Sequence, residues 1–218
     1  MKQEIENLRI LVEPGIRFLY SAIAFHEALA DEACVEKLNK NSDYWRLYES
    51  STLSCVFMAI RKIYENKAHT FNFQNFLDKC IVNLEEFSIN GVKDRKIKSG
   101  IFCEDSVKEY SSKCYEPNTD DFKEMGKFVR DRSKKMKGAY STVASKVYAH
   151  AIHFSHKEAL SANQCLNLYE IETALLSVWH CYEQVWQLYE NGRQPSYGEP
   201  NYQYKQEVIE GVYRQINA

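Results

Sequence analysis

The chain has 218 residues, a net charge of −2, and 44% hydrophobic residues, of which many are aromatic. These values exclude a disordered chain and fit a single globular domain over residues 1–218. The low counts of Gly (8) and Pro (4) argue against a turn-rich barrel or sandwich. We therefore expect an all-α fold made of few, long helices.

The cysteines and the hydrophobic runs indicate the compartment. Seven cysteines are widely spaced and form no CxxC pair, so neither a disulfide framework nor a zinc ribbon is indicated. The sequence has no apolar leader-like segment at its start and no run of about 18 apolar residues. We expect reduced thiols and a cytoplasmic protein that makes no membrane contact.

Apolar periodicity predicts three helical regions in the first 90 residues. The first runs from about Gly15 to Leu38, with Pro14 near its start and His26 as a partly buried, hydrogen-bonded side chain. The second begins near Ser42, a suitable N-cap. Its apolar stripe comprises Trp45, Tyr48, Thr52, Cys55, Ala59 and Ile63.

The third region, His69 to Phe87, is a shorter helix with Phe76 and Cys80 on its apolar side. After it, the charged stretch from Ser88 to about Gly100 breaks the pattern, and we expect a loop there. This stretch also carries a small basic cluster around Asp94.

A long helix is predicted to begin at Asn118 to Asp121 and to include a strongly basic segment, Lys123 to Lys137. Seven basic and two acidic residues give this segment a charge of +5. Such a segment is either a solvated helix face or a surface for a phosphate backbone. The predicted RNA contacts are Lys127, Arg130, Lys134, Lys135 and Lys137.

The last long helix has the most regular pattern, with apolar residues alternately three and four positions apart. This seam comprises Leu168, Ile171, Leu175, Val178, Tyr182, Val185 and Tyr189. The helix should end at Asn191-Gly192, where glycine suits a C-cap. A turn-rich segment and a terminal helix, about Tyr202 to Ile216, follow.

The stretch ASKVYAHAIHFSH, Ala144 to His156, holds three of the six histidines. On a regular helix their directions spread over about 120°, so they cannot converge on one metal ion. The sequence lacks a GxSxG elbow and both common phosphate loops. We expect no metal and no cofactor.

Two interpretations of this stretch stay open. In the first, the protein cleaves RNA without a metal: His150 takes the proton of a ribose 2′-OH, Lys146 supplies a cation, and His153 lies beside them. In the second, His150 is a hydrogen-bonded polar residue at a helix interface and catalyses nothing.

Several segments resemble the HEPN superfamily, and within it the AbiU-like abortive-infection branch. They are SKVYAHAIHFS, YENGRQPSY, LSCVFMAIRKIYEN and FNFQNFLDKC, and the resemblance covers roughly Tyr44 to Tyr197. It implies a helical bundle with a core of about residues 15–192, a C-terminal helical extension over 193–218, and a homodimer whose motif helices face each other. It also implies a ribonuclease site, with the family's histidine at His150 and its lysine at Lys146.

The sequence departs from the family motif RNKVYAH at its arginine, because Ala144 stands there. Ile152 replaces a tyrosine that some members offer to a partner enzyme for nucleotide transfer. Either Lys146 substitutes for the arginine or the activity is lost, and lysine lacks the planar, bidentate guanidinium. We expect an RNA-linked defence or toxin–antitoxin protein with a degraded nuclease motif, and as partners RNA, a nucleotidyltransferase or an antitoxin. The alternative is a non-catalytic, dimeric interaction or scaffold protein.

Overall fold

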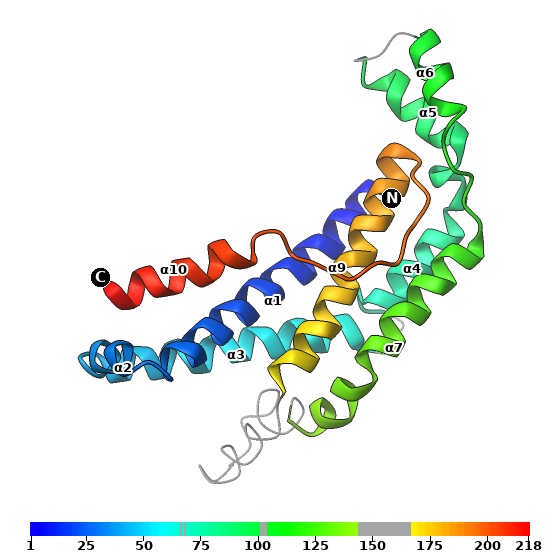
Figure 1. Ribbon diagram of the computed structural model, residues 1–218. Coiled ribbons are helices and arrows are strands. Elements are labelled where there is room, and N and C mark those ends of the chain that lie inside the picture. The colour runs from blue at the N-terminus through cyan, green and yellow to red at the C-terminus, as the bar shows by residue number, and fades with distance from the viewer. Residues whose placement is uncertain (66, 68, 101–103, 144–166) are drawn as a thin grey trace.

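The computed structural model describes residues 1–65, 67, 69–100, 104–143 and 167–218, and of residues 104 and 137–143 only the helical backbone. Every regular element in these ranges is a helix (Figure 1). The predicted all-α fold is therefore confirmed for this part of the chain. The elements are α1 (Lys2–Ala28), α2 (Glu32–Asn39), α3 (Ser42–Tyr64), α4 (Phe73–Val82), the 3₁₀ helix η1 (Leu84–Phe87), α5 (Ile89–Lys98), α6 (Glu104–Ser111), α7 (Thr119–Val143), α9 (Leu168–Asn191) and α10 (Lys205–Asn217).

Helix α9 is the centre of the bundle, because it packs against both α1 and α7 (Figure 1). The predicted seam explains this position: its residues from Ile171 to Tyr189 are all buried, and Leu168 is partly buried. The predicted C-cap is also confirmed. Gly192 adopts a left-handed conformation with φ of +60°, and its N–H donates to the carbonyl of Leu188.

Helix α1 begins at Lys2, so the predicted start at Gly15 is wrong. Ile5, Leu8 and Val12 continue the buried stripe of the helix toward its N-terminus. Pro14 lies inside the helix and removes one backbone hydrogen bond, to the carbonyl of Ile10. Ile10 is exposed, so this carbonyl lies on a face of α1 that is open to solvent. The predicted single helix to Leu38 is divided at residues 29–31, after which Asp31 caps α2.

Helix α3 follows its predicted range, although its N-cap is Asn41 rather than Ser42. Four residues of the predicted stripe are buried, while Tyr48 and Cys55 are partly exposed. His26 of α1 reaches toward this helix, with its Nε2 3.4 Å from a carboxylate oxygen of Glu49. Its side chain is exposed, so the predicted partial burial is wrong.

The charged stretch after Ser88 is helix α5 and not a loop. The Ser88 hydroxyl accepts a hydrogen bond from the N–H of Gly91 and caps the helix. Arg95 holds α5 in place by donating to the carbonyls of Glu86 and Tyr189, and it lies 3.8 Å over the Tyr189 ring. The region predicted as one helix over 69–87 divides into α4 and η1. Helices α5 and α6 form a pair at one end of the molecule (Figure 1).

Residues 193–204, the C-terminal strap, run back across α9 and lead into α10, which packs on α1. Tyr202 anchors the strap, because its hydroxyl donates to Glu13 (3.1 Å) and accepts from Arg17 (2.9 Å). Val212 and Ile216 of α10 join Phe25 in a second, smaller core cluster. None of the helices in the described ranges has the length and hydropathy needed to cross a membrane.

Candidate nucleic-acid interface

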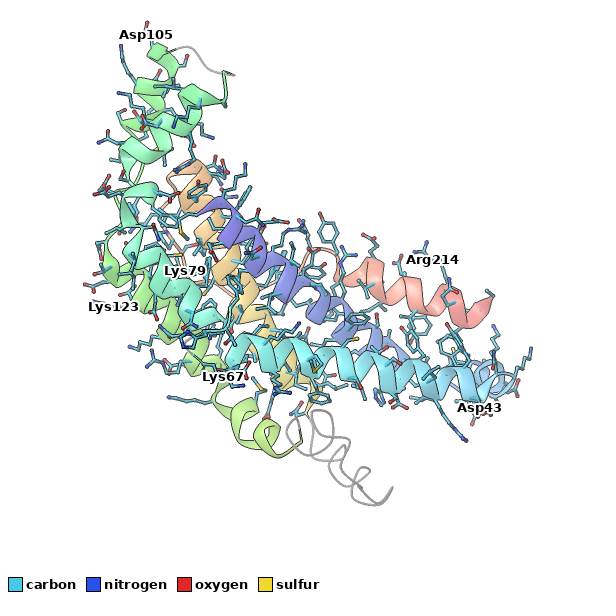
Figure 2. The ribbon with its side chains drawn as sticks, turned by 180° about the vertical axis from the view of Figure 1, so that it is seen from behind. Asp43, Lys67, Lys79, Asp105, Lys123 and Arg214 are labelled. Atoms are coloured by element: carbon cyan, nitrogen blue, oxygen red, sulfur yellow. The ribbon has the colours of Figure 1, made fainter. Side chains whose placement is uncertain are left out.

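Four basic side chains follow one face of α7. The burial of Phe122, Met125, Val129 and Met136 against the core fixes the rotation of this helix. Spacings of four, three and four residues bring side chains to one face of an α-helix. These spacings separate Lys123, Lys127, Arg130 and Lys134, all of them exposed, which together form the α7 basic row. Figure 2 shows Lys123 at the outer edge of the molecule.

The ion pairs of the row are local. Lys123 pairs with Asp120 (2.8 Å) and Lys134 with Asp131 (3.1 Å), each one helical turn away. Exposed pairs of this kind contribute little and are screened by salt, so a phosphate can compete for both lysines. Across the described ranges, Lys127 and Arg130 have no carboxylate within ion-pair distance. The middle of the row is therefore available to an anion.

The other basic residues of the segment from Lys123 to Lys137 are not part of the α7 basic row. Lys135 is exposed but lies about 100° around the helix from Lys134. The side chain of Lys137 lies outside the described residues. Arg132, which was not among the predicted contacts, lies 4.0 Å over the Phe128 ring and 3.7 Å from Glu199 of the strap. The charge of Arg132 therefore stabilises the fold. Lys123, also not among the predicted contacts, belongs to the row.

Arg130 lines a shallow pocket of about 300 Å³ between α7, the end of α3 and the start of α4. Asn72 caps α4 there by accepting a hydrogen bond from the N–H of Asn75 (2.8 Å). The carboxylate on the rim, Glu65, lies 2.6 Å from Lys67, whose hydrogen bond lowers the pKa of Glu65. Because Lys67 already compensates Glu65, Arg130 is the uncompensated charge beside this pocket.

Two buried groups that the structure describes beneath α7, Cys181 and Tyr64, are not activated as nucleophiles. The Cys181 thiol lies under the helix, and burial raises the pKa of this thiol well above its ordinary value. Burial likewise raises the pKa of Tyr64, whose hydroxyl donates to the carbonyl of Ala174 (3.1 Å). In the part of the chain that the structure describes, no three His, Cys, Asp or Glu side chains converge as metal ligands.

The predicted catalytic residues Lys146, His150 and His153 lie outside the described residues. In the sequence they fall between α7 and α9. The C-terminal end of α7 and the N-terminal end of α9 lie at the same end of the molecule (Figure 1). The basic row therefore runs along α7 toward the end where these two helices come together.

The sequence was compared with protein families and with known proteins. The model of the HEPN_AbiU2 family, described as AbiU2, matches residues 4–210. No curated protein and no solved structure matches the chain. The family match includes most of α1, all of the α7 basic row and α9, and extends into α10. Since it spans most of the 218 residues, the chain belongs to the HEPN_AbiU2 family.

Proposed function

We propose that this protein is an RNA-binding HEPN protein of abortive infection that acts in the cytoplasm. The RNA backbone runs along the α7 basic row toward His150. The observation that carries the proposal is the row itself, four exposed cations on one helix face, two of which have no ion-pair partner among the described residues. A linear set of cations neutralises phosphates and releases their counterions, which gives affinity without sequence preference.

The proposed chemistry uses His150 as the base for the ribose 2′-OH, Lys146 as the cation beside the phosphate, and His153 as a neighbouring imidazole. The family arginine is absent because position 144 is alanine. Lysine replaces only the charge of that arginine and not its bidentate hydrogen bonds. The proposal is therefore a protein that binds RNA and cleaves it weakly or not at all.

Binding is tested with the double variant Lys127→Glu/Arg130→Glu, measured by fluorescence anisotropy on a single-stranded RNA across a salt series. We expect at least a tenfold rise in Kd and a shallower dependence of log Kd on log salt. Lys40→Glu/Arg46→Glu is the matched control, because it makes the same change in net charge on exposed residues outside α7. Equal losses in the two double variants would show an effect of net charge alone.

Cleavage is tested in EDTA, since the mechanism uses no metal, by following single-stranded RNA and its cyclic-phosphate ends. If the wild type is active, His150→Ala should abolish cleavage and leave the circular dichroism spectrum unchanged. If it is inactive, Ala144→Arg should restore cleavage by returning the missing guanidinium. An inactive Ala144→Arg variant that also binds no RNA would defeat the proposal.

A second candidate function is an interaction module without chemistry of its own. One observation favours it: an apolar groove of about 650 Å³ between α1 and α3, with Ile10, Phe18 and Met58 partly exposed in it. The expected partner is a nucleotidyltransferase or an antitoxin. Coexpression with the product of a neighbouring gene, followed by size-exclusion chromatography, tests this candidate. A complex that Met58→Lys prevents would support it.

A further inference from the structure

A second cleft lies between α1, α9 and the C-terminal strap, and it includes no residue of the α7 basic row. Its volume is about 480 Å³. Trp179, Tyr182 and Trp186 of α9 and Tyr204 at the end of the strap supply aromatic surface, and amide side chains lie among them. Aromatic walls combined with a few polar groups are typical of sites for planar organic ligands.

Two of the four charged side chains that line this cleft, Arg9 and Glu13, are already compensated. The guanidinium of Arg9 donates to Glu13 (2.6 Å) and to Glu6 (2.5 Å), so this cation is neutralised on two sides. Glu13 also accepts hydrogen bonds from Arg17 and from the hydroxyl of Tyr202. Arg9 and Glu13 therefore form a polar rim of the cleft that needs no ligand.

Glu183 is different, because no cation pairs with it among the described residues. Burial raises the pKa of its carboxyl group, and the indole N–H of Trp179 offsets only part of this rise. Trp179 is only 5% exposed, and its N–H makes no hydrogen bond of ordinary geometry within the described part of the chain. A half-buried carboxylate without a cation and a buried donor without an ordinary hydrogen bond therefore lie together in the cleft, and both leave hydrogen-bonding capacity for a ligand.

The remaining groups restrict the ligand. Arg9 and Glu13 compensate each other, but a simple cation would still meet Arg193, which lines the cleft, and a simple anion would meet Glu183. A neutral planar ring avoids both repulsions and can stack on the aromatic side chains. Its edge must offer N–H donors to the Glu183 carboxylate. Guanine fits, because its Watson–Crick edge presents two adjacent N–H groups to the two oxygens of one carboxylate.

We propose that this cleft binds a guanine base, with Glu183 accepting hydrogen bonds from the base edge and Trp186 and Tyr204 supplying stacking surface. Trp179 lies beside the carboxylate, and Arg193 at the rim attracts a phosphate attached to the nucleoside. The base comes either from a free nucleotide or from an unpaired guanosine in RNA. The inference is independent of the proposed path of RNA along α7.

The experiment measures tryptophan fluorescence during titration with guanosine, GMP, adenosine and a short oligouridine that contains one guanosine. Trp45→Phe serves as the background, since it removes the only tryptophan outside the cleft. We expect saturable quenching by guanosine and at least tenfold weaker binding of adenosine. Tighter binding of GMP than of guanosine indicates a free nucleotide, whereas tightest binding of the oligonucleotide indicates an RNA base.

Glu183→Gln should raise the Kd for guanosine at least tenfold, because an amide replaces one acceptor by a donor. Binding to the wild type should also weaken as the pH falls and the Glu183 carboxylate is protonated. Glu170→Gln, on α9 but outside the cleft, is the control and should bind normally.

Absence of saturable quenching by any guanine ligand, with the wild type and Glu183→Gln both folded by circular dichroism, overturns the proposal. So does equal binding by Glu183→Gln. Lys127→Glu/Arg130→Glu should bind guanosine normally. The two proposals can therefore fail independently: loss of RNA binding along α7 leaves guanosine binding in the cleft unchanged.

Discussion

Two lysines of α7 form a matched pair for testing the basic row. Lys127 and Lys135 are both exposed on the same helix, and no ion pair holds either one within the described ranges. Lys127 belongs to the row, whereas Lys135 points about 80° away from Lys127 and about 110° away from the mean direction of the row. We expect Lys127→Glu to raise the Kd for single-stranded RNA about tenfold and Lys135→Glu about twofold, in the same anisotropy assay. Equal effects would mean that the phosphate backbone does not follow the row.

The C-cap of α9 depends on a residue without a Cβ. At Gly192 φ is +60°, and an added Cβ would lie 2.6 Å from the Sγ of Cys114. We expect Gly192→Ala to lower the free energy of unfolding by about 1–3 kcal/mol, through backbone strain and this overlap. Urea denaturation measures the loss. Gly198→Ala, in the strap, is the control, because its Cβ would meet nothing within 4 Å.

At the scale of helices, α1 and α3 approach each other closely at Gly15. A Cβ there would lie 2.7 Å from the Cβ of Ala59, so the two helices would have to separate. We expect Gly15→Ala to lower the free energy of unfolding by about 1–3 kcal/mol, although alanine favours an isolated helix by about 1 kcal/mol. Gly211→Ala in α10, with open space around it, should instead be neutral or stabilising. Equal stability of both variants in urea would contradict the close packing.

Long amphipathic helices could be predicted from the sequence, and short charged ones could not. The seam of α9 and its cap at Gly192 were predicted because apolar spacing and a terminal glycine are local signals. Helix α5 was missed because its charges conceal a single buried residue, Val92, and because Arg95 is held by Tyr189, far along the chain. Pro14 suggested a helix start, but packing of the first 13 residues outweighs the loss of one hydrogen bond.

Some features of the candidate sites could likewise be predicted from the sequence, and others could not. The 4-3-4 spacing of the basic row is present in the sequence, so the row could have been found there with Lys123 included. The structural role of Arg132 could not, because Glu199 lies far from it in sequence and comes close only through the strap. The cleft around Glu183 joins residues of α1, α9 and the strap, and only tertiary packing brings these together.

At the scale of the whole molecule, we predict a homodimer. The family resemblance implies motif helices that face each other, and α1 and α3 also expose apolar side chains, with Ile10 56% and Met58 42% accessible. A closed dimer would bury such a surface by two-fold symmetry. Multi-angle light scattering should therefore give about twice the chain mass of 25.5 kDa at micromolar concentration.

Two substitutions identify the surface that holds this dimer. If the α1–α3 groove is the interface, Ile10→Lys/Met58→Lys should give a folded monomer, because the interface would have to bury two charges of the same sign. Val82→Lys is the matched control: Val82 is 82% exposed on α4 and lies outside the groove, so this variant should remain dimeric. A dimer that survives the double substitution would assign the contact to a surface other than this groove. A monomeric wild type would contradict the prediction itself, and with it any active site composed from two chains.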